Sequence, residues 1–259
     1  MYAEKSMKSI FIFVVVGVVV VSAAFLFLNN KKAPSNDATP PSITTKQELK
    51  TQDFNFENPK KSAHYETNTP SHGAILPTPP INVVIDFNFD LSKPSSIKIE
   101  KDGQDFGIGE TLIDQNKLTM RRDFEPNAPD GLYTVLYNAC WPDKTCHEGN
   151  FQFAIDKKKA GSFIDLTNQK EVTINLKNIA FLPKDIKVSK GVKITWVNDD
   201  SAQHYINSDS HPAHSYFPAQ NSKALKQEES FILTFEKPGI YPYHCSAHAN
   251  SMSGNILVE

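Results

Sequence analysis

The chain has 259 residues, enough for one large domain or for two small domains with additional segments. Its 27 Lys and Arg nearly balance its 29 Asp and Glu, which gives a net charge of −2. A chain so close to neutral lacks the excess of basic residues that typically marks nucleic-acid binding, so we expect no nucleic-acid partner. The charge does not identify any other partner.

The first segment with a clear character is the uncharged apolar stretch from Ser9 to Leu28. Its length of about twenty residues is enough to cross a bilayer as a helix. A cleaved signal peptide would have a shorter apolar region followed by small residues, whereas large apolar residues continue here up to the Asn-Asn-Lys-Lys sequence. We therefore expect an uncleaved single-pass transmembrane anchor over 9–28, with a cleaved signal as the alternative.

The orientation of this anchor is weakly encoded, because two lysines precede the apolar stretch and two follow it. The simpler topology leaves the short tail, residues 1–8, in the cytoplasm. We therefore expect a protein of the cytoplasmic membrane whose domains lie on the extracytoplasmic side.

The next segment, 29–80, is rich in Pro, Ser, Thr, Asn and Lys and shows no sustained hydrophobic period. Such a composition cannot bury enough apolar surface to offset its ordering entropy. We expect a disordered linker that its prolines keep extended, so that the folded part stands away from the membrane.

From 81 to 156 the sequence alternates between apolar and polar residues in short runs separated by turn-forming residues. This pattern predicts a small β-sandwich. Cys140 and Cys146 flank a short loop within it, and outside the cytoplasm we expect them to form a disulfide. Cys245 is then the odd cysteine, which marks it as a metal ligand or a reactive thiol.

A second set of short strands follows a basic linker, 157–170, and occupies 171–259. No useful helical periodicity is present, so we expect an antiparallel β-sandwich or a Greek-key barrel. The predicted fold class is therefore all-β, with two β-sandwiches after an N-terminal transmembrane helix.

Soft metal ligands gather near the C-terminus, where Cys245, His248 and Met252 have the spacing C-x2-H-x3-M. Each residue alone is more often an ordinary core or surface residue, but the combination of thiol, imidazole and thioether favours copper. A structural zinc site would need four strong ligands. The adjacent His244 faces away from Cys245 if both lie in a strand, so the second imidazole must come from elsewhere. His204, after a strand and a polar turn, is the candidate.

The C-terminal segment resembles the cupredoxins, the group that contains plastocyanin, amicyanin and pseudoazurin. The resemblance is carried by "AFLPKDIKVSKGVKITWVNDDSAQH" and "FEKPGIYPYHCSAHANSMSGNILVE". It implies a Greek-key β-sandwich with one type 1 copper, held by His204, Cys245 and His248 with Met252 as the axial ligand. Two features depart from the family: the length of the loop between His248 and Met252, and Tyr205 where many members have Asn or Ser.

The first sandwich weakly resembles the copper-binding CopC domains and related immunoglobulin-like domains, through "AILPTPP" after His72 and "GLYTVLY" leading to "HEGNFQF". The resemblance implies a second copper site at His72, Asp143 and His147. A spacer domain without metal is the favoured alternative, because His72 is internal and the Asp and His spacing departs from the family's pattern.

Three further histidines lie near the C-terminal ligands. His211 and His214 flank Pro212 in a polar stretch and are expected to be solvated loop residues, with an accessory metal site as the less favoured alternative. A histidine directly before the cysteine ligand, as His244 is, binds a second catalytic copper in copper nitrite reductases. Those enzymes need further histidines from another domain, so we expect no catalytic residues and no enzymatic activity.

These features together predict a membrane-anchored type 1 (blue) copper protein, monomeric, that transfers single electrons between redox protein partners outside the cytoplasmic membrane. An extracytoplasmic copper chaperone or copper-resistance protein is the alternative. A copper oxidoreductase is a more distant third possibility.

Overall fold

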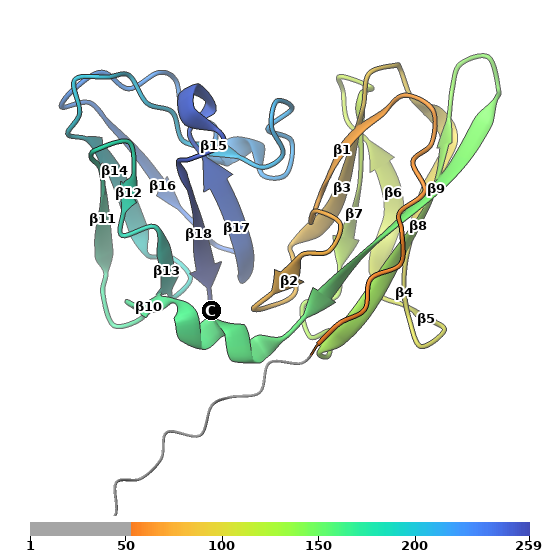
Figure 1. The fold of residues 1–259 in the computed structure, drawn as a ribbon, viewed down its shortest axis with the longest axis horizontal. Coiled ribbons are helices and arrows are strands. Elements are labelled where there is room, and N and C mark those ends of the chain that lie inside the picture. Colours follow the sequence, from red (N-terminus) through yellow and green to blue (C-terminus); the bar gives the residue numbers. More distant parts are fainter. Residues whose placement is uncertain (1–52) are drawn as a thin grey trace, which may run out of the picture. The chain divides into compact units, whose positions relative to one another are not determined.

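The computed structural model describes residues 53–259, which fold into an all-β unit with short 3-10 helices, as predicted (Figure 1). The predicted tail 1–8, the predicted anchor 9–28 and the first part of the predicted linker lie outside the described residues. Across 53–259 no helix combines the length and the apolarity that a membrane crossing requires.

The N-terminal sandwich consists of two sheets with strand orders β1-β3-β7-β6 and β2-β9-β8-β4-β5. In the first sheet the strands are β1 (Tyr65–Thr69), β3 (Asn82–Phe87), β7 (Thr119–Phe124) and β6 (Gly107–Ile113). In the second they are β2 (Ile75–Leu76), β9 (Cys146–Ile155), β8 (Gly131–Cys140), β4 (Ser92–Lys101) and β5 (Gln104–Asp105). Alternate residues of β8, such as Tyr133, Val135 and Tyr137, are buried, as expected for strands with one face on the core.

The predicted linker is wrong over its last part, because structure begins before residue 81. Strand β1 pairs antiparallel with β3, and β2 pairs parallel with β9. Composition alone suggested disorder there, since Pro and polar residues dominate. The backbone groups of this segment nevertheless find partners on strands that lie up to about ninety residues later in the sequence; for example, the Gly73 amide donates to the carbonyl of Gln152 at 2.8 Å.

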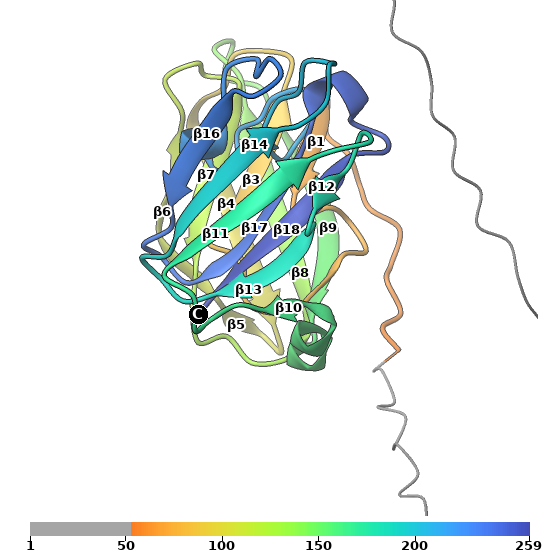
Figure 2. The same cartoon turned by 90° about the vertical axis from the view of Figure 1, so that its left-hand side faces the viewer.

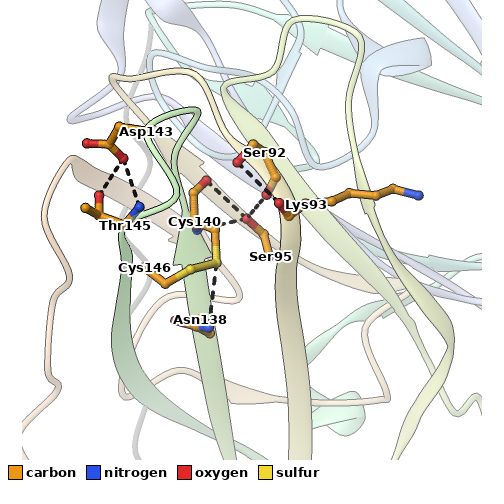
Figure 3. Close-up of a disulfide and its surroundings, with 8 residues drawn as sticks. All are labelled: Ser92, Lys93, Ser95, Asn138, Cys140, Asp143, Thr145 and Cys146. Carbon is orange, nitrogen blue, oxygen red and sulfur yellow. Dashed lines mark hydrogen bonds between the residues drawn. A yellow bond between two sulfur atoms is a disulfide. The ribbon is translucent and has the colours of Figure 1, made fainter.

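The disulfide predicted from the sequence is present and joins facing ends of β8 and β9 (Figure 3). Ser95 lies beside it, where its hydroxyl accepts a hydrogen bond from the Cys140 amide at 3.0 Å. Asp143, in the loop between the two cysteines, accepts hydrogen bonds from the amide and the hydroxyl of Thr145. The disulfide therefore closes a β-hairpin whose turn is also held by a side chain.

Asp105 joins neighbouring strands in the same sandwich. Its carboxylate accepts hydrogen bonds from the amides of Ile99 and Gly107 and pairs with Arg122 at 2.8 Å. Burial would raise the pKa of Asp105, but the hydrogen bonds and the guanidinium outweigh burial and lower that pKa.

The second predicted linker is also partly structured. A short 3-10 helix, η1 (Lys157–Ser162), begins where the Asp156 side chain accepts a hydrogen bond from the Lys158 amide. It leads to β10 (Ile164–Asp165), which pairs parallel with β13 (Asp185–Val188) and so belongs to the C-terminal sandwich. The prediction of a linker without strands over 157–170 is therefore wrong at β10.

The C-terminal sandwich has sheets of order β10-β13-β18-β17-β15 and β12-β11-β14-β16 (Figure 2). The remaining strands of the first sheet are β13 (Asp185–Val188), β18 (Ser253–Val258), β17 (Gly239–His244) and β15 (Asn207–Ser208). Those of the second are β12 (Phe181–Leu182), β11 (Glu171–Leu176), β14 (Lys193–Asn198) and β16 (Ser230–Thr234). Trp196, Phe235, Tyr241 and Tyr243 are fully buried between the sheets.

The sandwich is mixed rather than purely antiparallel, which corrects the sequence-based expectation. β11 runs parallel to β14, and β13 runs parallel to β18. The chain passes from β11 and β12 in one sheet to β13 in the other and back to β14, so strands that are near in sequence lie in different sheets. Pairs such as β17 and β18 remain antiparallel.

Gly254 in β18 is required by a close approach of backbone. A Cβ at this position would overlap the carbonyl oxygen of Lys184 and lie 2.7 Å from the Tyr243 hydroxyl oxygen. A side chain cannot be accommodated there without moving a neighbouring strand.

Side chains of the two sandwiches are hydrogen-bonded to each other. Asp86 on β3 is 2% exposed, and its carboxylate accepts hydrogen bonds from the hydroxyls of Ser210 at 2.7 Å and Ser215 at 2.9 Å. Arg121 on β7 donates to the Ser215 carbonyl at 2.9 Å. The loop after β15 is thus held by side chains of the N-terminal sandwich.

Candidate metal centre

Three of the four predicted copper ligands meet at one end of the C-terminal sandwich. Cys245 follows β17 and precedes the 3-10 helix η3 (Ser246–His248), so Cys245 and His248 come from one short loop. The Sγ of Cys245 lies 3.5 Å from Nδ1 of His204 and 3.6 Å from Nδ1 of His248. His204 and Cys245 are completely buried, and His248 is partly buried.

These distances fit a metal ion in a trigonal plane. With bonds of about 2.3 Å to sulfur and about 2.0 Å to nitrogen, as at zinc, the two donor atoms lie about 3.7 Å apart. The measured separations are within a few tenths of an ångström of that value. One thiolate and two imidazoles form the donor set of trigonal copper sites, so the residues present fit copper.

His204 is positioned by a turn that follows β14. The buried Asn198 side chain donates to the carbonyls of Ala202 and Leu225 at 2.8 Å and 2.9 Å, and His204 pairs with Leu225 through two backbone hydrogen bonds. The ring is oriented by Asp200, whose Oδ2 lies 3.0 Å from Nε2 of His204. Since Nε2 carries the proton donated to this carboxylate, Nδ1 keeps its lone pair for a metal.

Asp200 also organises the neighbouring turn. Its carboxylate accepts hydrogen bonds from the amides of Asn178 at 2.8 Å and Ile179 at 3.0 Å, both of which have left-handed backbone conformations. The Ile179 amide is the main cause of a lowered pKa of Asp200; the Asn178 amide and His204 act in the same direction and burial opposes them. The sequence-based reasoning missed this residue. Its position four residues before His204 was the available signal.

The thiol of Cys245 receives a further hydrogen bond from the Tyr205 backbone amide at 3.3 Å. The two ligand-bearing loops are therefore linked through the backbone, which does not depend on the side chain at position 205. Met252 is 1% exposed and belongs to the same hydrophobic cluster as Cys245. Its carbonyl accepts a hydrogen bond from the Cys245 amide at 2.9 Å, which closes the ligand loop.

His244 faces away from this centre, as the alternation of a strand predicted. Its Nδ1 lies 3.0 Å from Oδ1 of Asp209, and its ring lies against His211 and His214. The structure thus gathers the three accessory histidines, which sequence spacing did not predict. Burial, followed by the neighbouring His244 and His211, lowers the pKa of His214 to about 4.

The candidate residues of the first sandwich are not gathered in this way. His72 accepts a hydrogen bond from the Gln152 amide at 3.2 Å, whereas Asp143 and His147 are exposed near the disulfide. Within 53–259, only the sets His204–Cys245–His248 and His211–His214–His244 bring three such ligand atoms within 4.8 Å of one another. A copper site at His72, Asp143 and His147 stays a prediction.

Comparison with known families agrees with both resemblances drawn from the sequence. Residues 168–259 match the family model for copper binding proteins of the plastocyanin/azurin family. Residues 65–156 match the model of the CopC domain.

Individual relatives match the C-terminal sandwich. Amicyanin of Paracoccus denitrificans is 25% identical over 88 residues, which are 34% of this chain and 65% of that protein. Chloroplastic plastocyanin of Physcomitrium patens is 33% identical over 86 residues, 31% of this chain and 51% of that protein. The chain thus spans about half to two thirds of these curated relatives.

Solved structures match about the same share of this chain. A purple cupredoxin from Nitrosopumilus maritimus is 28% identical, with a TM-score of 0.30, covering 34% of this chain and 99% of that one. An oxidised amicyanin variant is 25% identical, with a TM-score of 0.31, covering 35% of this chain and 83% of that one.

The class of protein follows from these observations. Residues 168–259 are thus similar to copper binding proteins of the plastocyanin/azurin family, and residues 65–156 are similar to the CopC domain.

Proposed function

We propose that this chain is a one-electron carrier that holds a type 1 copper at His204, Cys245 and His248, with Met252 as the axial ligand. The observation that carries the proposal is the triangle of Cys245 Sγ and two imidazole Nδ1 atoms, already at separations of 3.5 Å and 3.6 Å. A copper ion bound there would accept and release one electron.

The protein's part is to keep the donors in place in both oxidation states. The Cys245 amide donates to the Met252 carbonyl, and the Tyr205 amide donates to Sγ of Cys245. His204 is held by Leu225 and Asp200. Because these partners belong to a packed β-sandwich, the donor atoms need little rearrangement when the charge at the site changes. Burial of the thiolate keeps water away from it.

His248 provides the route for the electron. It is the only one of the three strong donors that is not fully buried, and exposed Ala247 precedes it. On the neighbouring turn, Ile179 is 45% exposed and its amide is bonded to Asp200. We infer that a redox protein partner contacts this end of the sandwich around His248 and Ile179.

The copper ligands are tested by the visible spectrum of the copper-loaded chain. We expect an intense thiolate-to-copper absorption that disappears in Cys245→Ser. The paired change Cys140→Ser and Cys146→Ser is the matched control, since it removes the other sulfur atoms of cysteine and should leave the band intact. A colourless copper-loaded chain would refute a type 1 site.

Copper handling is the second candidate function, favoured by the CopC match over residues 65–156. A chaperone must release its metal, whereas a carrier must retain it through repeated redox cycles. We expect reversible one-electron voltammetry without loss of copper, and a shifted potential in Met252→Gln while the thiolate band persists. Transfer of copper to a chelator upon reduction, without a reversible wave, would favour the chaperone.

We further propose that the chain is anchored in the cytoplasmic membrane by residues 9–28, with both sandwiches on the extracytoplasmic side. The uncharged apolar stretch supports the anchor, and the disulfide supports an oxidising compartment. The full chain should stay in the membrane fraction after a high-salt wash. A released form that begins near residue 29 or later would show a cleaved signal instead.

A further inference from the structure

We propose that His211, His214 and His244 form a second metal site, which binds Cu(II) through three imidazoles. This site uses none of the donors of the cysteine-containing centre, so it goes beyond the proposed electron transfer. His244 is the residue immediately before Cys245, and the two side chains leave β17 toward different sites.

The first observation is an unpartnered buried nitrogen. His244 is 4% exposed, and its Nε2 has no hydrogen-bond partner among the described residues. Leaving a buried polar atom unpaired costs about 1 to 3 kcal/mol. Asp209 holds the other ring nitrogen at 3.0 Å. A carboxylate on Nδ1–H leaves Nε2 with its lone pair, which is the arrangement that orients histidine ligands at metal sites.

The second observation is convergence of three imidazoles. The ring centroid of His244 lies 5.3 Å from that of His211 and 5.1 Å from that of His214. The centroids of His211 and His214 lie 5.5 Å apart. One ligand atom from each ring lies within 4.8 Å of the others. Nitrogen ligands of a tetrahedral ion are roughly 3.3 Å apart, given bonds of about 2.0 Å. Rotation of the exposed His211 ring would shorten the separations of its own ligand atom from those of His214 and His244.

The hydrogen bonds of His214 leave it a free lone pair. Ser246 donates its hydroxyl proton to Oδ1 of Asn207 at 2.7 Å, so its contact with Nε2 of His214 at 3.0 Å requires that the histidine donates. A neutral histidine that donates from Nε2 has its lone pair on Nδ1. Ser246 therefore favours the tautomer in which Nδ1 is available to a metal.

The loop that carries His211 and His214 is fixed by the N-terminal sandwich. Ser210 and Ser215, on either side of the two histidines, both donate to the buried Asp86 carboxylate. Arg121 donates to the Ser215 carbonyl at 2.9 Å. The site thus depends on both domains, since one supplies the ligands and the other holds their loop.

The donor set selects the metal. Three imidazoles without a thiolate suit divalent copper or zinc, and copper binds such nitrogen sites more tightly than zinc does. Because His211 is exposed, the site opens to solvent and leaves a position for water or a small anion. The bound Cu(II) should be nearly colourless, because no sulfur ligand contributes an intense band.

The test is a titration of the metal-free full chain with Cu(II), in the presence of excess glycine as a competing ligand for loosely bound metal. The wild-type chain should bind one copper more than the His211→Ala, His214→Ala double variant. The copper that is lost should have an EPR spectrum with coupling to imidazole nitrogens. The blue band of the cysteine centre should be unchanged in the double variant.

Two single variants keep the result interpretable. His211→Ala removes an exposed ring and should weaken Cu(II) binding at this site at least tenfold without affecting folding, since even indirect partners of ligands change affinity about 10- to 100-fold. His64→Ala removes an exposed imidazole outside the cluster and should leave the amount of bound copper unchanged. Equal copper content in the wild-type chain and the double variant would overturn the proposal. So would tight binding that survives the His211 substitution.

The two copper proposals can fail separately. Cys245→Ser should lose the blue band and still bind the colourless copper. The histidine variants should keep the blue band and lose the colourless copper. Loss of both signals in Cys245→Ser, in a chain that remains folded, would show that the three histidines do not form an independent site.

Discussion

Replacing Asp200 with Asn should weaken copper binding at the cysteine-containing centre without removing any ligand. The carboxylate accepts three hydrogen bonds, from the amides of Asn178 and Ile179 and from Nε2 of His204. An Asn side chain has one acceptor oxygen and places an NH2 group where the second carboxylate oxygen was. At least one of the three donors then faces another donor.

The size of the effect follows from these contacts. A hydrogen bond to a charged group contributes about 1.5 to 3 kcal/mol, so the metal-free chain should lose an amount of this order in its free energy of unfolding. Removing an indirect partner of a ligand typically lowers metal affinity about 10- to 100-fold, and we expect the same here.

The assay is competition for copper against a chelator of known affinity, followed through the blue band, together with urea denaturation of the metal-free chain. Asp199→Asn is the matched control, since it makes the same change of charge at the exposed neighbouring position. If Asp200→Asn and Asp199→Asn bound copper equally tightly, Asp200 would not orient His204, and the reasoning would be refuted.

Three other predictions concern the stability of the two sandwiches. Replacing both Cys140 and Cys146 with Ser should lower the free energy of unfolding by about 2 kcal/mol, the loop-closure contribution of so short a loop, and an unchanged urea midpoint would argue against it. Asp105→Asn should lower the free energy of unfolding at neutral pH, because the ionised carboxylate stabilises the fold. The difference in free energy of unfolding between the two chains should shrink as pH falls below about 4 and through the lowered folded-state pKa of Asp105. A difference that does not depend on pH, in denaturation curves from pH 7 to 2, would contradict this. Gly254→Ala should cost about 1 to 3 kcal/mol by overpacking, whereas Gly161→Ala, where a methyl meets no atom within 4 Å, should be nearly neutral in the same thermal unfolding assay.

The sequence by itself determined the all-β class and most of the strands. Alternation of apolar and polar residues is a local property, and in β11 and β14 every second residue is buried, as the pattern requires. It also determined the candidate copper ligands in one loop, because Cys245 and His248 lie close in the chain. The disulfide followed from equally local spacing.

Apart from His204, which the sequence already indicated as a partner of Cys245, the tertiary structure alone decided which distant residues meet. The pairing of β15 with β17 brings His244 to His211 and His214. The loop that carries His211 and His214 is held by Asp86, which lies 124 residues before Ser210 in the chain. Asp200 acquires its role only because its carboxylate reaches both a turn about twenty residues earlier and the ring of His204. The antiparallel strand direction predicted from the sequence was wrong for part of the sandwich, since parallel pairing of β11 with β14 depends on the crossing of the chain between sheets. Periodicity reports which face of an element is buried, whereas contacts between elements depend on how those faces pack in three dimensions.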